Sequence, residues 1–144
     1  MIEIRKMGLG DAAAVANLTE QLGYPANVNK TLQRIKLMAN IAGNCIFVAL
    51  ANEQVVGWTH AFYTVRIESD PFVEIGALVV DAAHRNKQIG KKLILHVIEW
   101  ARETNVQMLK VRCNVIRTES HVFYERTGFN LSKSQKIFEM KILS

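Results

Sequence analysis

The sequence contains no apolar run near the roughly 18 residues that a membrane-spanning helix requires. Its first residues, Met-Ile-Glu-Ile-Arg-Lys, alternate in polarity like a strand and lack the basic start and apolar stretch of a signal peptide. Only two cysteines are present, Cys45 and Cys113, and both lie in apolar strand-like segments. They fit small core residues in a reducing compartment better than a disulfide. We therefore expect a cytoplasmic protein with no membrane partner.

The sequence also lacks the common motifs of nucleotide and metal sites. No G-x-G-x-x-G follows a strand, no G-x-x-x-x-G-K-[ST] occurs, and no Cys/His spacing suggests a metal. The net charge is +5, yet the cations are spread along the chain except for a cluster between residues 85 and 92. No basic tail or alternation of aromatic and basic residues is present to stack bases. A small polyanionic ligand is expected, and no nucleic acid.

The chain of 144 residues is 49% hydrophobic, which predicts one domain over residues 1–144. Apolar periodicity predicts strands at 2–6, 45–51, 55–66, 72–80 and 108–113, with one or two more in 129–143. It predicts helices at 11–22, with Asp11 as N-cap, and at 29–40, 90–104 and 118–127. This order predicts an α/β (α+β) fold with a mixed, mostly antiparallel sheet of about six to seven strands and about four helices on both faces.

The segment 79–93 joins the end of a buried strand to an amphipathic helix, with Gly90 at the helix entrance. Four cations surround this turn: Arg85, Lys87, Lys91 and Lys92. A helix N-terminus presents unpaired backbone N–H groups and partial positive charge. Together with the cations, these groups predict a pocket for phosphate oxygens. The alternative is a solvated basic loop.

Two motifs, the loop at residues 85–90 and the segment at residues 117–129, make this sequence resemble the GNAT superfamily of acyl-CoA-dependent N-acetyltransferases. The loop Arg85-Asn86-Lys87-Gln88-Ile89-Gly90 matches the pattern [Q/R]-x-x-G-x-[G/A] at its first and last residues, with Gln88 where glycine is usual. Residues 117–129, Arg-Thr-Glu-Ser-His-Val-Phe-Tyr-Glu-Arg-Thr-Gly-Phe, resemble R-x-x-A-H-x-F-Y-E-x-x-G-F, with Ser120 in place of alanine. This ending is most similar to aminoalkylphosphonate and aminoglycoside-type N-acetyltransferases.

The resemblance implies that acetyl-CoA binds along the fourth strand and the loop after it, where the fourth and fifth strands splay apart. Its pantetheine arm would meet the backbone of the strand end and its pyrophosphate the loop amides. A backbone N–H donates whatever its side chain, but glycine tolerates positive φ, so Gln88 bears on the shape of the loop. The cofactor-binding residues are therefore expected to be Leu78, Val79, Val80, Arg85, Asn86, Lys87, Gln88, Ile89, Gly90, Lys91 and Arg117. For Arg117 the alternatives are a contact with a substrate anion and a solvated arginine before the helix.

Acetyl transfer to an amine requires a neutral amine, although a free alkyl amine has a pKa of about 10.4. A general base therefore accelerates the reaction. Glu74 is the predicted base, because a carboxylate in a buried strand is a costly misfit and its offset from the loop matches the basic glutamate of histone acetyltransferases. Its alternatives are an ion pair or an exposed sheet edge. Tyr124 aligns with the family tyrosine that protonates the thiolate; its alternative is core packing.

The acceptor site is predicted from His60 and Arg66, on one face of the third strand. Tyr24 lies where the resemblance implies a substrate lid between the first two helices; its alternative is simple loop packing. Neither cysteine is placed as an acyl carrier, which favours direct attack in a ternary complex. The leading hypothesis is a small-molecule N-acetyltransferase. The alternatives are a protein or peptide acetyltransferase, a non-catalytic acyl-CoA-binding module and, least favoured, a basic nucleic-acid-binding domain. A homodimer through a sheet edge or the C-terminal strand is compatible with the pattern.

Overall fold

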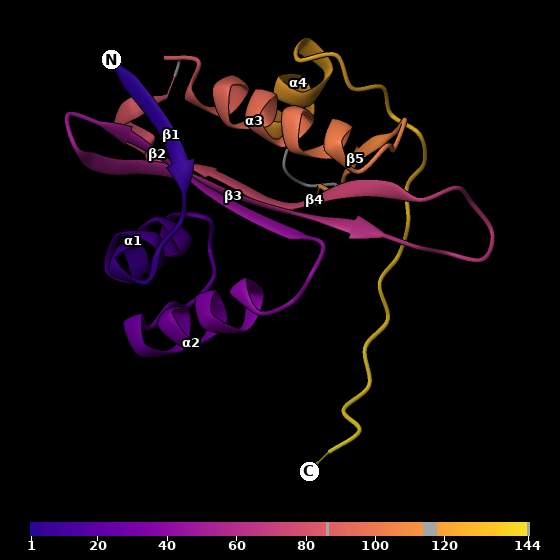
Figure 1. The fold of residues 1–144 in the computed structure, drawn as a ribbon, viewed down its shortest axis with the longest axis horizontal. Coiled ribbons are helices and arrows are strands. Elements are labelled where there is room, and N and C mark those ends of the chain that lie inside the picture. Colours follow the sequence, from indigo (N-terminus) through magenta and orange to yellow (C-terminus); the bar gives the residue numbers. More distant parts are fainter. Residues whose placement is uncertain (86, 114–117, 144) are drawn as a thin grey trace. The chain divides into compact units, whose positions relative to one another are not determined.

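The computed structural model describes residues 1–85, 87–113 and 118–143 (Figure 1). Its strands are β1 (Ile2–Lys6), β2 (Asn44–Ala51), β3 (Gln54–Thr64), β4 (Phe72–Val80) and β5 (Leu109–Val111). Its α-helices are α1 (Ala12–Gln21), α2 (Val28–Ala39), α3 (Ile89–Glu103) and α4 (Thr118–Arg126), and two short 3-10 turns are η1 (Leu9–Asp11) and η2 (Ala82–His84). The chain divides into two compact units, Met1–Arg112 and Cys113–Ser144.

The first unit is built on one sheet with the strand order β1-β2-β3-β4-β5. The first four strands are antiparallel to their neighbours, and β5 runs parallel to β4. Helices α1 and α2 lie against one face of this sheet and α3 against the other (Figure 1). The predicted mixed, mostly antiparallel sheet is confirmed. The predicted strand number is wrong, because the described residues form a 5-stranded sheet rather than one of six or seven.

The missing strands are those predicted in residues 129–143, which form neither helix nor strand. A strand is stabilised by the ladder of a neighbour, and an alternating pattern does not supply one. The large apolar side chains of this segment are exposed: Leu131, Ile137, Phe138, Met140, Ile142 and Leu143. Before it, α4 ends as predicted at Gly128, whose φ of 107° is a left-handed conformation that glycine adopts readily.

Helix α3 packs on the sheet through an apolar stripe with helical spacing. Ile89, Leu93 and Val97 are almost fully buried, as such a stripe requires. Gly57 on β3 allows the close approach, because a Cβ there would lie 3.4 Å from Ile89 Cγ2 and from Leu93 Cδ1, and 3.0 Å from Val79 O. This packing fixes the start of α3 beside the end of β4. Among the described residues, no helix is both long and apolar enough to cross a membrane.

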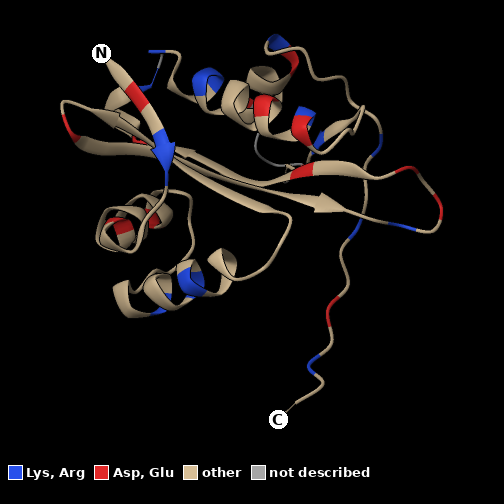
Figure 2. Cartoon of the chain, in the orientation of Figure 1, with Lys and Arg blue, Asp and Glu red and all other residues tan. Residues whose placement is uncertain are grey.

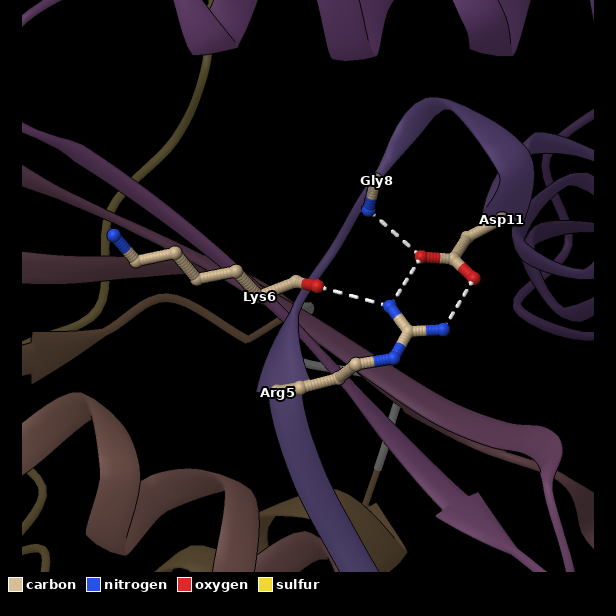
Figure 3. Close-up of polar contacts among 4 residues, drawn as sticks. All are labelled: Arg5, Lys6, Gly8 and Asp11. Carbon is tan, nitrogen blue, oxygen red and sulfur yellow. Dashed lines mark hydrogen bonds and ion pairs between the residues drawn. The ribbon is translucent and has the colours of Figure 1, made fainter.

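An ion pair joins β1 to the turn before α1 (Figure 3). Arg5 donates through Nη1 and Nη2 to the two carboxylate oxygens of Asp11 at 2.8 and 2.9 Å, and the Gly8 amide donates to the same carboxylate at 2.7 Å. Asp11 is only 7% exposed. Asp11 occupies the predicted N-cap position of α1, but its side chain caps no amide of that helix and instead joins η1 to β1.

We expect Asp11→Asn to lower the free energy of unfolding by about 2 kcal/mol near neutral pH, because a charge-assisted hydrogen-bond network is lost. The hydrogen bond from Arg5 lowers the pKa of Asp11 below its ordinary 3.8. The stabilisation is thus complete above the unfolded-state pKa and is lost as pH falls through the lower folded-state pKa. Urea unfolding at several pH values would test this. A deficit that stayed constant down to the lowest pH would contradict it.

Candidate active site

The connection from β4 to α3 is fastened at its start by the end of α1. The Asp81 amide donates to Val56 O at 2.8 Å, which continues the pairing with β3 by one residue. Gln21 donates through Nε2 to Asp81 Oδ1 and accepts from the Ala82 amide, both at 2.9 Å. His84 Nδ1 lies 2.7 Å from Asp81 Oδ2. The hydrogen bonds from Gln21 and His84 lower the pKa of Asp81, so this carboxylate stays ionised and held in place.

The connection ends at an uncapped helix start. Gln88 precedes α3 with φ 60° and ψ 21°, and its side chain makes no capping hydrogen bond. The first helical bond runs from the Lys92 amide to Gln88 O at 3.1 Å. The amides of Ile89, Gly90 and Lys91 precede that bond and so have no acceptor within the helix. Gln88, at the position where the family pattern has glycine, thus adopts a left-handed conformation, and the three amides after it stay without an acceptor within the helix.

Positive charge surrounds this helix start. Arg85, Lys87 and Lys91 are exposed, and the first turn of α3 contains no acidic residue. Figure 2 shows basic segments in blue at the start of α3 and in the connection before it. Exposed cations beside orphan amides favour an anionic ligand. Two residues predicted for the same ligand, Asn86 and Arg117, lie outside the described residues.

A bulge interrupts β4 upstream of this connection. Ala77 and Ile75 pair with consecutive residues of β3, so Gly76 between them has no register partner there. Thr59 on β3 donates through Oγ1 to Ala77 O at 2.7 Å and fastens the strand just beyond the bulge. The parallel ladder with β5 covers only Val73–Ile75. Within the described part of the chain, β4 therefore has no neighbour on its β5 side beyond the bulge.

This one-sided strand end contains Leu78, Val79 and Val80, the residues predicted to bind through their backbone. The side chain of Val79 is buried, and Leu78 and Val80 are half-buried. Because the strand lacks a neighbour on this side, its outward backbone groups face no other described strand. An extended ligand with amide groups would form hydrogen bonds with these backbone groups, as an added strand does.

Glu74 is buried, 7% exposed, and paired. Its Oε1 accepts from Arg112 Nε at 3.1 Å, so the ion pair considered as an alternative is present. Its register partners are Phe62 on β3 and Lys110 on β5. Arg112 was not predicted as a site residue, although its spacing from Lys110 places both on one face of an extended chain. The role of Glu74 as a base stays a prediction.

His60 lies on the same face of the sheet as Glu74. Its ring centroid is 5.2 Å from that of Phe62, the register partner of Glu74. Its Nε2 lies 2.8 Å from Asn44 Oδ1, and a Cβ built on Gly76 would lie 3.1 Å from its Nδ1. Burial lowers the pKa of His60. The structure thus brings together two predicted residues, a base and an acceptor-site residue, around the bulge of β4.

The other predicted acceptor residues lie elsewhere. β3 ends at Thr64, so Arg66 lies in the following loop rather than on the strand, with its guanidinium 5.7 Å from the centroid of the Phe72 ring. Lys110 Nζ lies 4.1 Å from the same centroid. Tyr24 is 63% exposed between α1 and α2. A pocket of about 540 Å³ at the start of β4 is lined by none of the predicted site residues.

Tyr124 lies in α4, in the second unit. Its ring makes edge contacts with Phe123 and Phe129, at centroid distances of 5.3 and 5.7 Å. The Phe129 amide also donates to Tyr124 O at 3.0 Å, which anchors the segment after the helix. Aromatic packing thus orients the ring. The role of Tyr124 as an acid stays a prediction.

Burial makes Cys45 unsuited to carry an acyl group. It lies within β2, and desolvation raises the pKa of its thiol to about 12. The thiolate, which is the nucleophilic form, is therefore nearly absent at neutral pH.

The conformation of Gln88 generates a stability prediction. A left-handed conformation strains a residue with a Cβ by about 1–2 kcal/mol, and a β-branched side chain fits it worst. In Gln88→Gly, relief of this strain is largely offset by the greater freedom of the unfolded chain, so a change within about 0.5 kcal/mol is expected. Gln88→Val should lower the free energy of unfolding by about 1–2 kcal/mol. Equal stability of the two variants in thermal unfolding would contradict the left-handed assignment.

Comparisons with known proteins agree with this geometry. The model of the Acetyltransferase (GNAT) family matches residues 14–129. An aminoalkylphosphonate N-acetyltransferase of Salmonella typhimurium is 30% identical over 86 residues, which cover 59% of this chain and 56% of that protein. The chain therefore spans about half the length of this curated relative.

Solved structures share the fold. An aminoglycoside 6'-N-acetyltransferase from Acinetobacter haemolyticus superposes with a TM-score of 0.86 at 17% identity, over 97% of this chain and 99% of that one. An aminoglycoside N-acetyltransferase in complex with CoA gives 0.85 at 20% identity, over 99% of this chain and 96% of that one. At these identities the likeness shows the fold alone. The family match covers most of the chain and confirms the resemblance of its two motifs: the chain belongs to the acetyltransferase (GNAT) family.

Proposed function

We propose that this protein transfers the acetyl group of acetyl-CoA to the primary amine of a small molecule, by direct attack in a ternary complex. The observation that carries the proposal is the junction of β4 with α3. There a strand edge without a neighbour leads into a helix start with orphan amides and exposed cations. Membership of the acetyltransferase family supports the same reaction, and a structural neighbour is in complex with CoA.

The residues present at the junction fit two parts of coenzyme A, the pyrophosphate and the pantetheine arm. The amides of Ile89, Gly90 and Lys91, with the side chains of Arg85 and Lys87, would hold the pyrophosphate. The backbone of β4 from Leu78 to Val80 would hold the pantetheine amides in the manner of an added strand. Acetyl-CoA supplies an activated acyl carbon at the far end of that arm, toward the bulge. Asn86 and Arg117 stay predicted phosphate contacts.

The charges near the bulge favour an amine that also carries an anionic group. The carboxylate beside the bulge, that of Glu74, is paired with Arg112, whose side chain is still 50% exposed. Lys110 and Arg66 add two cations around the neighbouring Phe72 ring. A polycationic aminoglycoside would be repelled by this arrangement, whereas a phosphonate or carboxylate would be attracted. Similarity to an aminoalkylphosphonate N-acetyltransferase supports this class.

The roles of single residues follow from the needs of the reaction. The amine has to lose a proton before it attacks, and Glu74 is the base predicted from the sequence. The leaving thiolate takes a proton, for which the Tyr124 hydroxyl is the predicted donor. The high pKa of the buried Cys45 thiol supports direct attack rather than an acyl-enzyme.

Titration calorimetry with acetyl-CoA tests the cofactor site. We expect binding in the micromolar range for the wild type and loss of binding in Gly90→Trp, because the indole would fill the space at the orphan amides. Gly10→Trp is the matched control, since a side chain at this exposed position meets no atom within 4 Å. Equal affinity of all three proteins, or no binding to folded wild type, would refute the assigned site.

A panel of amines tests the substrate class. With saturating acetyl-CoA, we expect kcat/KM for 2-aminoethylphosphonate to exceed that for kanamycin and for a lysine peptide by at least about tenfold, equivalent to one ionic contact of about 1.4 kcal/mol. Arg112→Gln should remove most of this preference. A preference for the peptide would favour the protein acetyltransferase, and tight acetyl-CoA binding without turnover of any amine would favour the non-catalytic module.

A further inference from the structure

We propose that His60, through its Nδ1 atom, accepts the proton of the attacking amine, in the role predicted from sequence for Glu74. This inference rests on the proposed acetyl transfer and assigns a catalytic residue to it. Three observations carry it: the tautomer of the imidazole, the opening that Gly76 leaves at Nδ1, and the pairing of Glu74 with Arg112.

The hydrogen bonds around Asn44 determine the tautomer. Asn44 donates through Nδ2 to Ile41 O at 3.3 Å, which turns its Oδ1 toward the imidazole. That oxygen only accepts, and it lies 2.8 Å from His60 Nε2. Nε2 therefore carries the hydrogen, and Nδ1 of the neutral ring keeps a lone pair. A neutral imidazole with a directed lone pair is the form that a general base requires.

The bulge of β4 leaves Nδ1 accessible. A side chain at Gly76 would place its Cβ 3.1 Å from Nδ1 and 3.1 Å from Phe62 Cε1, so only glycine leaves this space open. Gly76 itself is exposed, and the ladder with β5 ends at the residue before it. Nδ1 thus faces the point where β4 loses its neighbour, which is where the proposed pantetheine arm would end. Among the contacts of the described residues, no hydrogen bond occupies Nδ1.

The nearby charges differ in their effect on the two candidate bases: among the described residues, Glu74 is ion-paired, and His60 is not. Burial lowers the pKa of His60, with no charged neighbour adding to the shift, so the ring is neutral at neutral pH. The charged groups beside the bulge are Glu74 from β4, Lys110 from β5 and Arg112 after it, and the hydrogen-bond partner from β2, Asn44, is neutral. On the same face, β1 contributes Glu3 and also Arg5, which is paired with Asp11. The Glu74 carboxylate already accepts from a permanent cation, Arg112. The imidazole is therefore the base with a free lone pair.

The proposed step conserves protons and electrons. An ammonium group gives one proton to His60 Nδ1 and becomes a neutral amine. The lone pair of the amine nitrogen then forms a bond to the acetyl carbon, and the carbon–sulfur bond breaks with its electron pair on sulfur. The sulfur takes a proton from its predicted donor, the Tyr124 hydroxyl, and the second proton that leaves the nitrogen restores that hydroxyl through water. The products are a neutral amide and a thiol, and the imidazolium returns its proton to water.

The test compares the pH profiles of His60→Gln, Glu74→Gln and His96→Gln with acetyl-CoA and 2-aminoethylphosphonate. His96 is an exposed histidine on α3 and is the matched control. We expect His60→Gln to lower kcat about 100-fold near pH 7 with unchanged affinity for acetyl-CoA. The kcat/KM of this variant should rise tenfold per pH unit all the way to the pKa of the amine. It should lack the acidic limb of the wild type, which is the fall in kcat/KM as His60 becomes protonated. Glu74→Gln and His96→Gln should both keep that limb.

Two outcomes would overturn the role of His60 alone: an unchanged profile in His60→Gln, or loss of the acidic limb in Glu74→Gln. A wild type that turns over no amine would refute the proposed function as well, so the two failures are distinguishable. Nitrogen-15 NMR of the imidazoles adds a readout independent of turnover. The Nε2–H tautomer of His60 is expected in the wild type, and a hydrogen on Nδ1 would refute the inference.

Discussion

The first unit depends on a conflict in the pairing of β4. On one side the strand stays bonded to β3 along its whole length, and on the other it leaves β5 after Ile75. The bulge at Gly76 occurs where the two requirements meet, and the bond from Thr59 to Ala77 O fastens the strand beyond it. A bulge twists and redirects a strand locally. The backbone edge, the opening beside His60 and the approach to α3 all follow from this single interruption.

The polar groups along β4 differ in whether they have partners: the carboxylates are bonded, and the amides at the start of α3 have no acceptor within the helix. Asp81, just after β4, is bound by Gln21 and His84, so this carboxylate in the connection to α3 is already hydrogen-bonded. Glu74 is likewise bound by Arg112. The amides at the start of α3 are instead left without an acceptor within the helix. Positive potential is thus available both at the start of α3, where it would stabilise the phosphates of the cofactor, and beside Glu74, where it would stabilise an anionic acceptor.

Local signals predicted much of this architecture. The bounds of β4 match residues 72–80 as expected, and α3 and α4 start within one residue of the predicted positions, because amphipathic periodicity and glycine stops are properties of neighbouring residues. Residues 129–143 show the limit of local patterns, since an alternating pattern does not provide a partner strand. Gln88 departs from the family pattern in sequence, and its left-handed backbone could not be read from the residue pattern.

The partners of the candidate site were not predictable in the same way. The bonds from Arg112 to Glu74 and between His60 and Asn44 depend on strand registers that join distant segments. Only the register of β4 with β5 shows that the misfit carboxylate has its counterion. Glu74 and His60 could be selected as site residues from the sequence, but the partner of each could not.

The burial of Cys45 has a practical consequence. Its thiol is almost entirely protonated at the mildly alkaline pH used for maleimide coupling, because its pKa is raised to about 12. The other cysteine, Cys113, is half-buried and stands at the boundary between the two compact units. The unaltered protein thus offers one selective attachment point for a fluorophore. A dye can therefore be attached there without any engineered residue.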